Sequence, residues 1–348
     1  MTLDLSQLAN AQRLLFEIPL RPVQGQRFQP TGFPGLGAAT FQTKDGACLL
    51  VESAQSMANR LELTIWDEAA QDVKAGLKGI SHVKVVKKDG EFLTDSILES
   101  HRLNSPYVLN AKKGGALFFD LLGNRLNAFE TGAINRKELA KTLLDLDIGC
   151  LIHGLFLSAN INKKTLAGGR LRVARALSAF VEADGVKVAA SGGVKNDHVN
   201  PSGDTKAGFG NVPFARDEFT AERITLYVNL DLAQIRGYGL GDDVEYLLVL
   251  MALYKLRALV DGGLRLRTAC DLQVDPSGKE PFTAKSLTSF SLPDLDMLKL
   301  DLKEAITCCN ERMAGSVVTY EEKIEPKKGN NKEGGEDESD EDDVNTEE

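Results

Sequence analysis

The residues best suited to chemistry gather in one stretch, Leu49 to Ile65 (LLVESAQSMANRLELTI), which has the spacing of a helix. Its polar residues recur at steps of three and four in two rows: Ser53, Ser56 and Arg60, and Glu52, Gln55 and Asn59. Each row lies on one strip of a helix. Hydroxyl and amide groups beside an arginine can bind phosphate and sugar oxygens without reading a base. The alternative, which residue types alone favour, is an amphipathic helix whose small polar side chains pack against a neighbour.

A second polar set lies upstream, in a loop rich in glycine and proline that runs from Arg21 to Gly37. Arg27, Gln29 and Thr31 stand there beside two phenylalanines. Basic and aromatic groups on a glycine-rich loop suit contact with a sugar-phosphate chain. A plain connecting loop is the somewhat better explanation when the residues are taken alone.

Arg170 and Arg172 lie at the start of the segment Gly168 to Ala183, whose apolar residues have helical spacing. Arginine at a helix N-terminus opposes the macrodipole, and a bound anion would relieve that unfavourable interaction. The segment therefore predicts a helix with a weak phosphate contact at its start.

The loop of residues 191–217 is rich in glycine, asparagine, aspartate and proline and has little to bury. A loop of this length inside a compact domain is usually functional or disordered. Both flanks have the character of strands, so we expect an extended hairpin that projects from the body. Its basic and aromatic residues include Lys195, Lys206, Phe209 and Arg216.

Several other segments are expected to position these residues. Strands are predicted at Arg13–Leu20, Phe41–Val51, Cys150–Ala159, Arg223–Leu232 and Leu264–Leu272. In the last of these, Arg265 and Arg267 share the face opposite the apolar residues. A helix apolar nearly all round is expected from an Asp242 cap to Val260, and a final helix over residues 297–313. His153 is predicted to be a core residue.

The net charge of −9 comes from the end of the chain, because residues 321–348 hold 13 acids and 4 lysines. The first 320 residues hold 37 acids and 37 bases, so their neutral total does not exclude a basic nucleic-acid groove. The 5 cysteines have no metal-ligand spacing. With no export signal and no apolar run of membrane-spanning length, we expect a cytoplasmic protein with no membrane partner.

In order, the predicted elements give an α+β protein with a ferredoxin-like (RRM-type) core and additions. The body, about residues 12–315, resembles the Cas seven backbone subunits of type I CRISPR interference complexes, which are RAMP-superfamily proteins. The resemblance is carried by RFQPTGFPGLGAATF followed by LLVESAQSMANRLE, and then by GLFLSA, YVNLDL and the helix–GG–strand unit ending at Leu272. It is strongest to the subtype I-U (I-G) branch. Where this family commonly has basic residues after Ser-x-Gln-Ser, the chain has Ala58 and Asn59, followed by Arg60.

The resemblance implies a palm (1–65, 151–190 and 218–320), inserted helical fingers (66–150) and a projecting thumb hairpin (191–217), and we expect a disordered acidic tail (321–348). It implies a non-catalytic subunit, with no cofactor and no metal, that binds the guide crRNA backbone without sequence specificity. The implied partners are further copies in a helical filament, a Cas five/six-like guide-capping subunit, a large subunit, a helicase-nuclease, and target DNA through the guide. The predicted RNA-binding residues are Arg27, Gln29, Thr31, Ser53, Gln55, Ser56, Asn59, Arg60, Arg170, Arg172, Lys195, Lys206, Phe209, Arg216, Arg265 and Arg267.

Two other functions stay open. An endoribonuclease of the same superfamily needs a general acid and base near the scissile phosphate, and His101, His153 and His198 are available without an evident partner. Asp197, Asp204 or Asp217 are alternatives for cutting a paired RNA target. A metabolic enzyme with a phosphorylated ligand is disfavoured, because the chain has no P-loop, nucleophile elbow or metal cluster.

Overall fold

The computed structural model describes residues 3–33, 37–129, 132–167 and 170–323. This part of the chain divides into two compact units. The larger unit, called the body below, holds the residues up to 189 and residues 218–321; the smaller holds residues 190–217 and, of the other described residues, 322 and 323. The predicted disordered tail lies outside the described residues from 324 onward.

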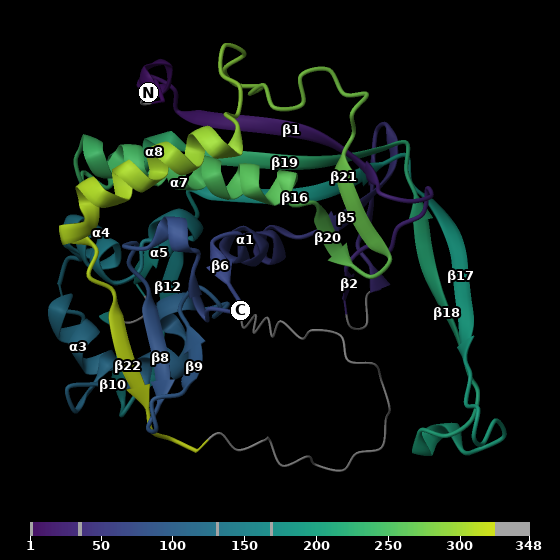
Figure 1. The fold of residues 1–348 in the computed structure, drawn as a ribbon, viewed down its shortest axis with the longest axis horizontal. Helices are drawn as coiled ribbons and strands as arrows, with labels where there is room; N and C mark the ends of the chain where they lie inside the picture. Colours follow the sequence, from purple (N-terminus) through teal and green to yellow (C-terminus); the bar gives the residue numbers. More distant parts are fainter. Residues whose placement is uncertain (1–2, 34–36, 130–131, 168–169, 324–348) are drawn as a thin grey trace. The chain divides into compact units, whose positions relative to one another are not determined.

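The body is built on an antiparallel sheet with the strand order β20-β21-β1-β19-β16-β5-β4 (Figure 1). Its strands are β1 (Arg13–Pro22), β4 (Thr40–Thr43), β5 (Gly46–Glu52), β16 (Leu177–Asp184), β19 (Arg223–Asp231), β20 (Leu264–Arg267) and β21 (Cys270–Val274). Buried and more exposed side chains alternate along β1 and β16, as expected for a sheet that packs one face on a core. The predicted strands at the positions of β1 and β19 are confirmed, and so is the mixed α+β class.

The helices α1 (Ala54–Leu63), α7 (Asp242–Asp261) and α8 (Leu295–Cys309) pack in the body. Figure 1 shows α7 and α8 side by side, and α1 contacts both α7 and β16. Every side chain from Leu247 to Leu256 is buried, which confirms the predicted core helix. Its N-cap is Gly241, with φ +97°, and not the predicted Asp242, which is the first residue of the helix. A short helix, α6 (Leu232–Gly237), precedes it.

Residues 66–150 are not mostly helical, contrary to the prediction. They contain α2 (Pro106–Leu109), α3 (Phe118–Arg125), α4 (Arg136–Leu146) and α5 (Gly149–His153), but also β6 (Trp66–Asp67), β7 (Asp72–Val73), β8 (Val83–Lys87), β9 (Phe92–Asp95), β10 (Lys112–Lys113) and β11 (Ala116–Leu117). A second sheet has the order β11-β10-β22-β8-β9. Its strand β22 (Ser316–Tyr320), which the sequence pattern missed, pairs in parallel with β8. The end of the body therefore completes a sheet that begins more than two hundred residues earlier.

The segment Gly168–Ala183, predicted as a helix, forms strands where it is described. After β15 (Leu171–Val173) comes β16, in which Leu177, Ala179, Val181 and Ala183 are buried. Leu177 and Val181 fit a helical spacing as well, but the full set has a period of two. Pairing with β19 on one side and β5 on the other selects the strand.

Three other boundaries differ from the predictions. Cys150–Ala159 is α5 followed by β12 (Leu155–Leu157), separated by Gly154 at φ +82°. Leu264–Leu272 is not one strand but the paired strands β20 and β21. The helix predicted from Leu49 begins only after Ser53, because Leu49 to Glu52 belong to β5.

The remaining short elements of the body are β2 (Gly32–Phe33), β3 (Gly37–Ala38), β13 (Asn160–Ile161), β14 (Lys164–Thr165), η1 (Ser6–Leu8), η2 (Ala75–Leu77), η3 (Arg102–Asn104) and η6 (Asn310–Arg312).

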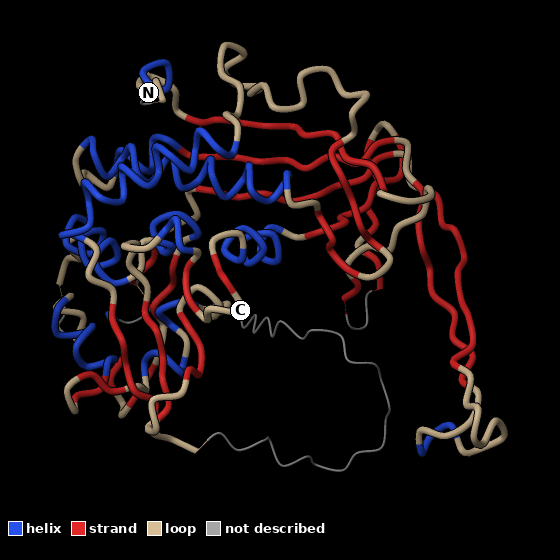
Figure 2. Tube along the Cα trace, in the orientation of Figure 1, coloured by secondary structure: helices blue, strands red, loops and turns tan. Residues whose placement is uncertain are grey.

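The smaller unit is the tip and arms of a hairpin. Strands β17 (Lys187–Lys195) and β18 (Val212–Thr220) pair as a two-stranded sheet, drawn as paired red tubes in Figure 2. At the tip, a carboxylate oxygen of Asp197 accepts hydrogen bonds from the amides of Val199 (2.8 Å) and Asn200 (2.9 Å). Its other oxygen accepts from the amide of Gly210 at 2.8 Å. One aspartate thus holds the hairpin tip together, beside the 3-10 turn η5 (Thr205–Ala207).

Candidate nucleic-acid interface

A buried carboxylate lies at the centre of the predicted polar site. Glu52 is the last residue of β5, separated from α1 only by the N-cap Ser53, and it is 1% exposed. Its Oε1 accepts hydrogen bonds from Nε of Arg60 at 2.8 Å and from the hydroxyl of Ser56. Its Oε2 accepts from the guanidinium of Arg267. Glu52, Ser56, Arg60 and Arg267 are called the Glu52 cluster below.

The two arginines of the Glu52 cluster also tie three separate elements together. Arg60 donates to the carbonyl of Leu266 at 2.6 Å and to that of Arg265 at 3.4 Å. Arg267 donates to the carbonyls of Gln29 at 3.1 Å and Val51 at 3.3 Å. The cluster therefore fixes α1 and the loop at Gln29 against β20.

The loop that follows β1 is held by the sheet and is not a free connection. Its backbone pairs at Phe28 with Phe219, the amide of Gln29 donates to the carbonyl of Ala269 at 2.8 Å, and the amide of Thr31 donates to the carbonyl of Val51 at 3.1 Å. The side chain of Phe28 is buried. Gln29 and Thr31 consequently lie beside the start of α1, so the predicted residues of the loop and of the helix can belong to one surface.

The first turn of α1 presents small polar groups next to this frame. Ser53 is the N-cap, and its hydroxyl accepts from the amide of Ser56 at 3.3 Å. The side chain of Gln55 is exposed, and it has no hydrogen-bond partner among the described residues. Asn59 is half-buried one turn later. Met57, Ala58 and Leu61 form the buried face of the helix.

Fewer positive charges are available to phosphate near α1 than the number of predicted arginines suggests. Glu52 neutralises one of the two arginines in its cluster, and Arg27 pairs loosely with Glu218 at 3.7 Å. The guanidinium of Arg265 is exposed and has no carboxylate within 4.0 Å in the described part of the chain. Ser56, Arg60 and Arg267 therefore pack against neighbouring polar groups of the fold, which was the alternative to RNA binding for the polar residues of this helix. Their contact with RNA stays a prediction.

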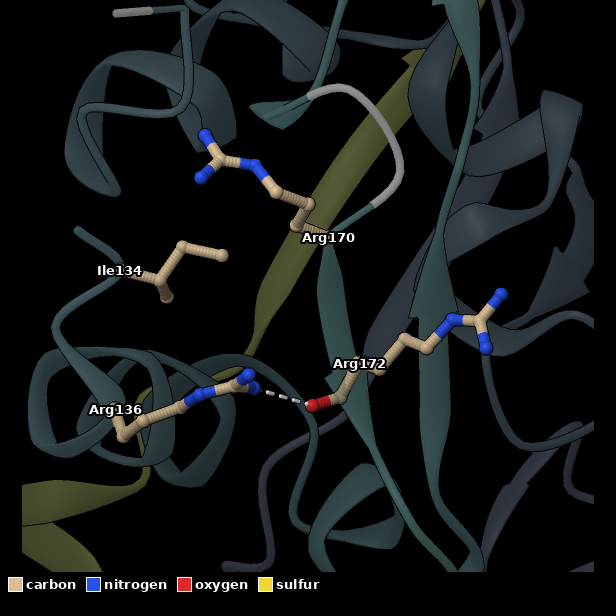
Figure 3. Close-up of a pocket in the computed structure, with 4 residues that line it drawn as sticks. All are labelled: Ile134, Arg136, Arg170 and Arg172. Carbon is tan, nitrogen blue, oxygen red and sulfur yellow. Dashed lines mark hydrogen bonds between the residues drawn. The ribbon is translucent and has the colours of Figure 1, made fainter. Parts of the chain in front are cut away.

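Arg170 and Arg172 do not lie at a helix N-terminus, so the macrodipole argument for them is wrong. Arg172 is in β15, and Arg170 directly precedes it. Both line a cavity of about 560 Å³ together with Ile134 and Arg136 (Figure 3). Sequence reasoning missed Arg136, whose signal was its place at the first helical position after the Asn135 cap of α4.

The predicted residues of the hairpin belong to the smaller unit. Lys195 ends β17, and Lys206 and Phe209 are exposed at the tip. Arg216 lies in β18. Asp204 accepts a hydrogen bond from the amide of Lys206 at 3.0 Å, so it serves the fold of the tip as Asp197 does.

The candidate histidines include one that is confirmed as a core residue. His153 is 1% exposed, and its Nε2 lies 2.9 Å from Nζ of the fully buried Lys255. Burial and the neighbouring cations lower the pKa of His153 well below its usual range. His198 is exposed in the hairpin. Among the described residues, no group of His, Cys, Asp and Glu side chains is placed to hold a metal ion.

The fold and these sites define an α+β protein whose polar surfaces are framed by arginine, hydroxyl and amide groups. Residues 14–188, half of the chain, match the family described as CRISPR-associated protein GSU0053, so the chain belongs to this family of CRISPR-associated proteins. This confirms the predicted CRISPR resemblance at the level of the family.

Two further comparisons complete this picture. A solved structure titled "CRISPR RNA-guided surveillance complex, pre-nicking" contains a chain with 13% sequence identity and a TM-score of 0.34, covering 86% of this chain and 88% of that chain. No curated protein matches the sequence. In the described part of the chain, every helix is too short or too polar to cross a membrane.

Proposed function

We propose that this chain is a backbone subunit of a CRISPR RNA-guided interference (Cascade) complex, of the subtype I-U branch. Several copies polymerise along one guide crRNA and hold its sugar-phosphate backbone, which leaves the bases free to pair with target DNA. Because guides differ in sequence, a repeated subunit must bind them without reading bases. In this proposal the body sheet with α1 and α7 is the ferredoxin-like palm, and residues 191–217 are the thumb.

One observation carries the proposal within this family: three segments distant in sequence meet at the Glu52 cluster. They bring together the first loop, the start of α1 and the turn from β20 to β21. The resulting surface offers the side chains of Gln29, Thr31, Ser53, Gln55 and Arg265, which are the hydroxyl, amide and guanidinium groups that bind phosphate and ribose. The Glu52 cluster fixes the backbone of the first loop, α1 and β20, from which these side chains project.

The first test is purification of the tagged chain from cells that also express its neighbouring genes and a CRISPR array. Bound nucleic acid is measured by the absorbance ratio, and the RNA is then sequenced. We expect a large assembly that contains RNA of one guide length. A small particle free of RNA under these conditions contradicts the proposal.

A second test locates the interface. Gln55→Ala and Arg265→Gln change exposed side chains on the surface, and Lys303→Ala removes an exposed charge from α8 as the control. We expect the two surface variants to weaken binding of unrelated guide-length RNAs by similar factors, while the control binds normally. Loss of the phosphate contact of Arg265 also lowers the salt slope by about 0.7.

The proposed role is non-catalytic. Incubation of labelled guide and paired target RNA with the assembled complex, with and without Mg²⁺, is expected to leave both strands intact. Cleavage that disappears in Asp217→Asn would instead favour the endoribonuclease alternative. Asp217 is the informative candidate, since the carboxylates of Asp197 and Asp204 are occupied by backbone amides.

A further inference from the structure

We propose that Arg136, Arg170, Arg172 and Phe156 form a second nucleic-acid subsite, which binds one unpaired nucleotide of a single RNA strand. The guanidinium groups of Arg136 and Arg170 hold its phosphate, and the stacked pair Phe156–Arg172 supports its base. The choice of RNA as the ligand rests on the proposed function. The site itself is separate from the Glu52 cluster and shares no residue with it.

The stack is placed by the pairing of β12 with β15. Phe156 lies directly opposite Arg172 in this antiparallel pair, while Leu155, Leu157 and Leu171 are buried. Because alternate residues of a strand point to opposite faces, Phe156 and Arg172 point away from the core. The guanidinium carbon lies 4.2 Å from the ring centroid, and the phenylalanine is 41% exposed. An exposed aromatic ring under an arginine is a platform on which a base can stack.

The other two arginines are anchored through part of their hydrogen-bonding capacity. Arg136 donates from NH1 to the carbonyl of Arg172 at 2.8 Å, as the dashed line in Figure 3 shows. Arg170 donates from Nε to the carbonyl of Ala167 at 2.9 Å and from NH1 to that of Gly132 at 3.1 Å. Each guanidinium has five N–H donors, so donors remain for a ligand after these contacts. These bonds already restrict the side-chain conformations of Arg136 and Arg170, so binding a phosphate costs less conformational entropy.

The charge of this cavity is uncompensated by the described side chains. No carboxylate in the described residues lies within 4.0 Å of the guanidiniums of Arg136, Arg170 or Arg172. The Glu52 cluster differs, because there two arginines share one buried carboxylate. The cavity of about 560 Å³ therefore has the guanidiniums of Arg136 and Arg170 beside it, while the side chain of Arg172 leads away from it to Phe156 (Figure 3). Two arginines without a carboxylate partner form a stronger site for an anion than the predicted surface on α1.

The apolar neighbours favour a nucleotide over an acidic peptide. Carboxylates would use the charges of Arg136 and Arg170 but not the Phe156–Arg172 stack or the side chain of Ile134, which also lines the cavity. A nucleotide uses both, through its phosphate and the face of its base. Stacking tolerates any base, as binding to varied guides requires.

The test measures binding of the full chain to a labelled single-stranded oligouridylate and to an abasic strand of the same length. Arg136→Gln and Arg170→Gln are expected to weaken binding of both strands and to lower the salt slope by about 0.7 each. Phe156→Leu is expected to weaken binding of the oligouridylate by about fivefold or more and to leave the abasic strand unaffected. Lys303→Ala is the charge control, and thermal unfolding of each variant reports its folding.

The outcomes separate this inference from the proposed function. Binding of RNA by the wild-type chain with unchanged affinity in all three folded variants overturns the subsite and leaves the proposed function intact. A synthetic acidic peptide of residues 321–348 tests the other ligand class. If the variants bind RNA as wild type does but no longer bind this peptide, the cavity is an acidic-peptide site, and the RNA subsite is likewise overturned. A wild-type chain that binds neither RNA strand overturns both. If one arginine variant unfolds, Phe156→Leu with its two strands decides the question.

Discussion

Nε of Arg60 donates to Oε1 of Glu52 at 2.8 Å, and the carboxylate that accepts this bond is 1% exposed. Eight residues separate the two in sequence, and Arg267, more than two hundred residues further on, shares the same carboxylate. Arg60 and Arg267, which sequence analysis assigned to RNA, are therefore first of all part of the fold. A carboxylate built into the site holds them in place.

Replacing Glu52 should cost stability, because two partly buried arginines would lose their only carboxylate partner among the described residues. We expect Glu52→Gln to lower the free energy of unfolding by about 3 kcal/mol, measured by urea titration. The control is Glu321→Gln, which breaks an exposed pair with Lys112 and should leave the free energy of unfolding nearly unchanged. Equal effects of the two substitutions would contradict the structural role of Glu52.

Arg60→Glu should affect both binding and folding. The new carboxylate faces Glu52, so we expect a lower melting temperature as well as weaker RNA binding and a smaller salt slope. The loss should be about equal for all guide sequences, since phosphate carries no sequence information. Gln55→Ala, which removes an exposed amide, should weaken binding without the change in melting temperature. A strong loss on one RNA sequence but not on another argues against backbone recognition.

Lys255 gives the protein a specific pH dependence. Burial lowers the pKa of this lysine from 10.5 to about 8 in the folded chain. Between these values the unfolded chain binds more protons, so the free energy of unfolding rises with pH across this range. We expect wild type to gain on the order of 3 kcal/mol from pH 8 to pH 10.5 relative to Lys255→Met.

The comparison of wild type with Lys255→Met is needed because a neighbouring group opposes the trend. Burial raises the pKa of the Cys150 thiol well above its usual value, which lowers stability as pH rises. Both proteins contain this cysteine, so the difference between them isolates the lysine. Two parallel curves over this pH range would show that Lys255 does not change its protonation on unfolding.

Asp197 should control the hairpin tip without affecting the body. Its three backbone hydrogen bonds lower its pKa, so this stabilisation is present above the unfolded pKa and is lost as pH falls through the folded value. We expect Asp197→Asn to speed hydrogen exchange at the amides of Val199, Asn200 and Gly210, with the melting temperature of the body unchanged. Asp217→Asn serves as the control, since no described group bonds to its side chain. Unchanged exchange in the first variant would mean that the tip is held in another way.

The local sequence pattern was sufficient to predict the elements whose own periodicity or composition fits one type of structure. The strict alternation in Arg223–Leu232 predicted β19, and the continuous apolar sequence before Gly262-Gly263 predicted the buried helix α7. The break of composition at residues 191–217 marked the hairpin. In each case the periodicity or the composition of the segment itself excludes the other structures.

Tertiary structure decided the elements whose residues fit two periods. Leu177 and Val181 are compatible with a helix and with a strand, and only the neighbours β19 and β5 select the strand. Likewise, Glu52 looks like one more polar residue of a helix until β20 and the first loop close over it. Sequence by itself determined which residue types are present for binding phosphate. Which arginines a buried carboxylate occupies, and which stay available beside a cavity, depends on contacts between distant segments, and local spacing carries no information about those.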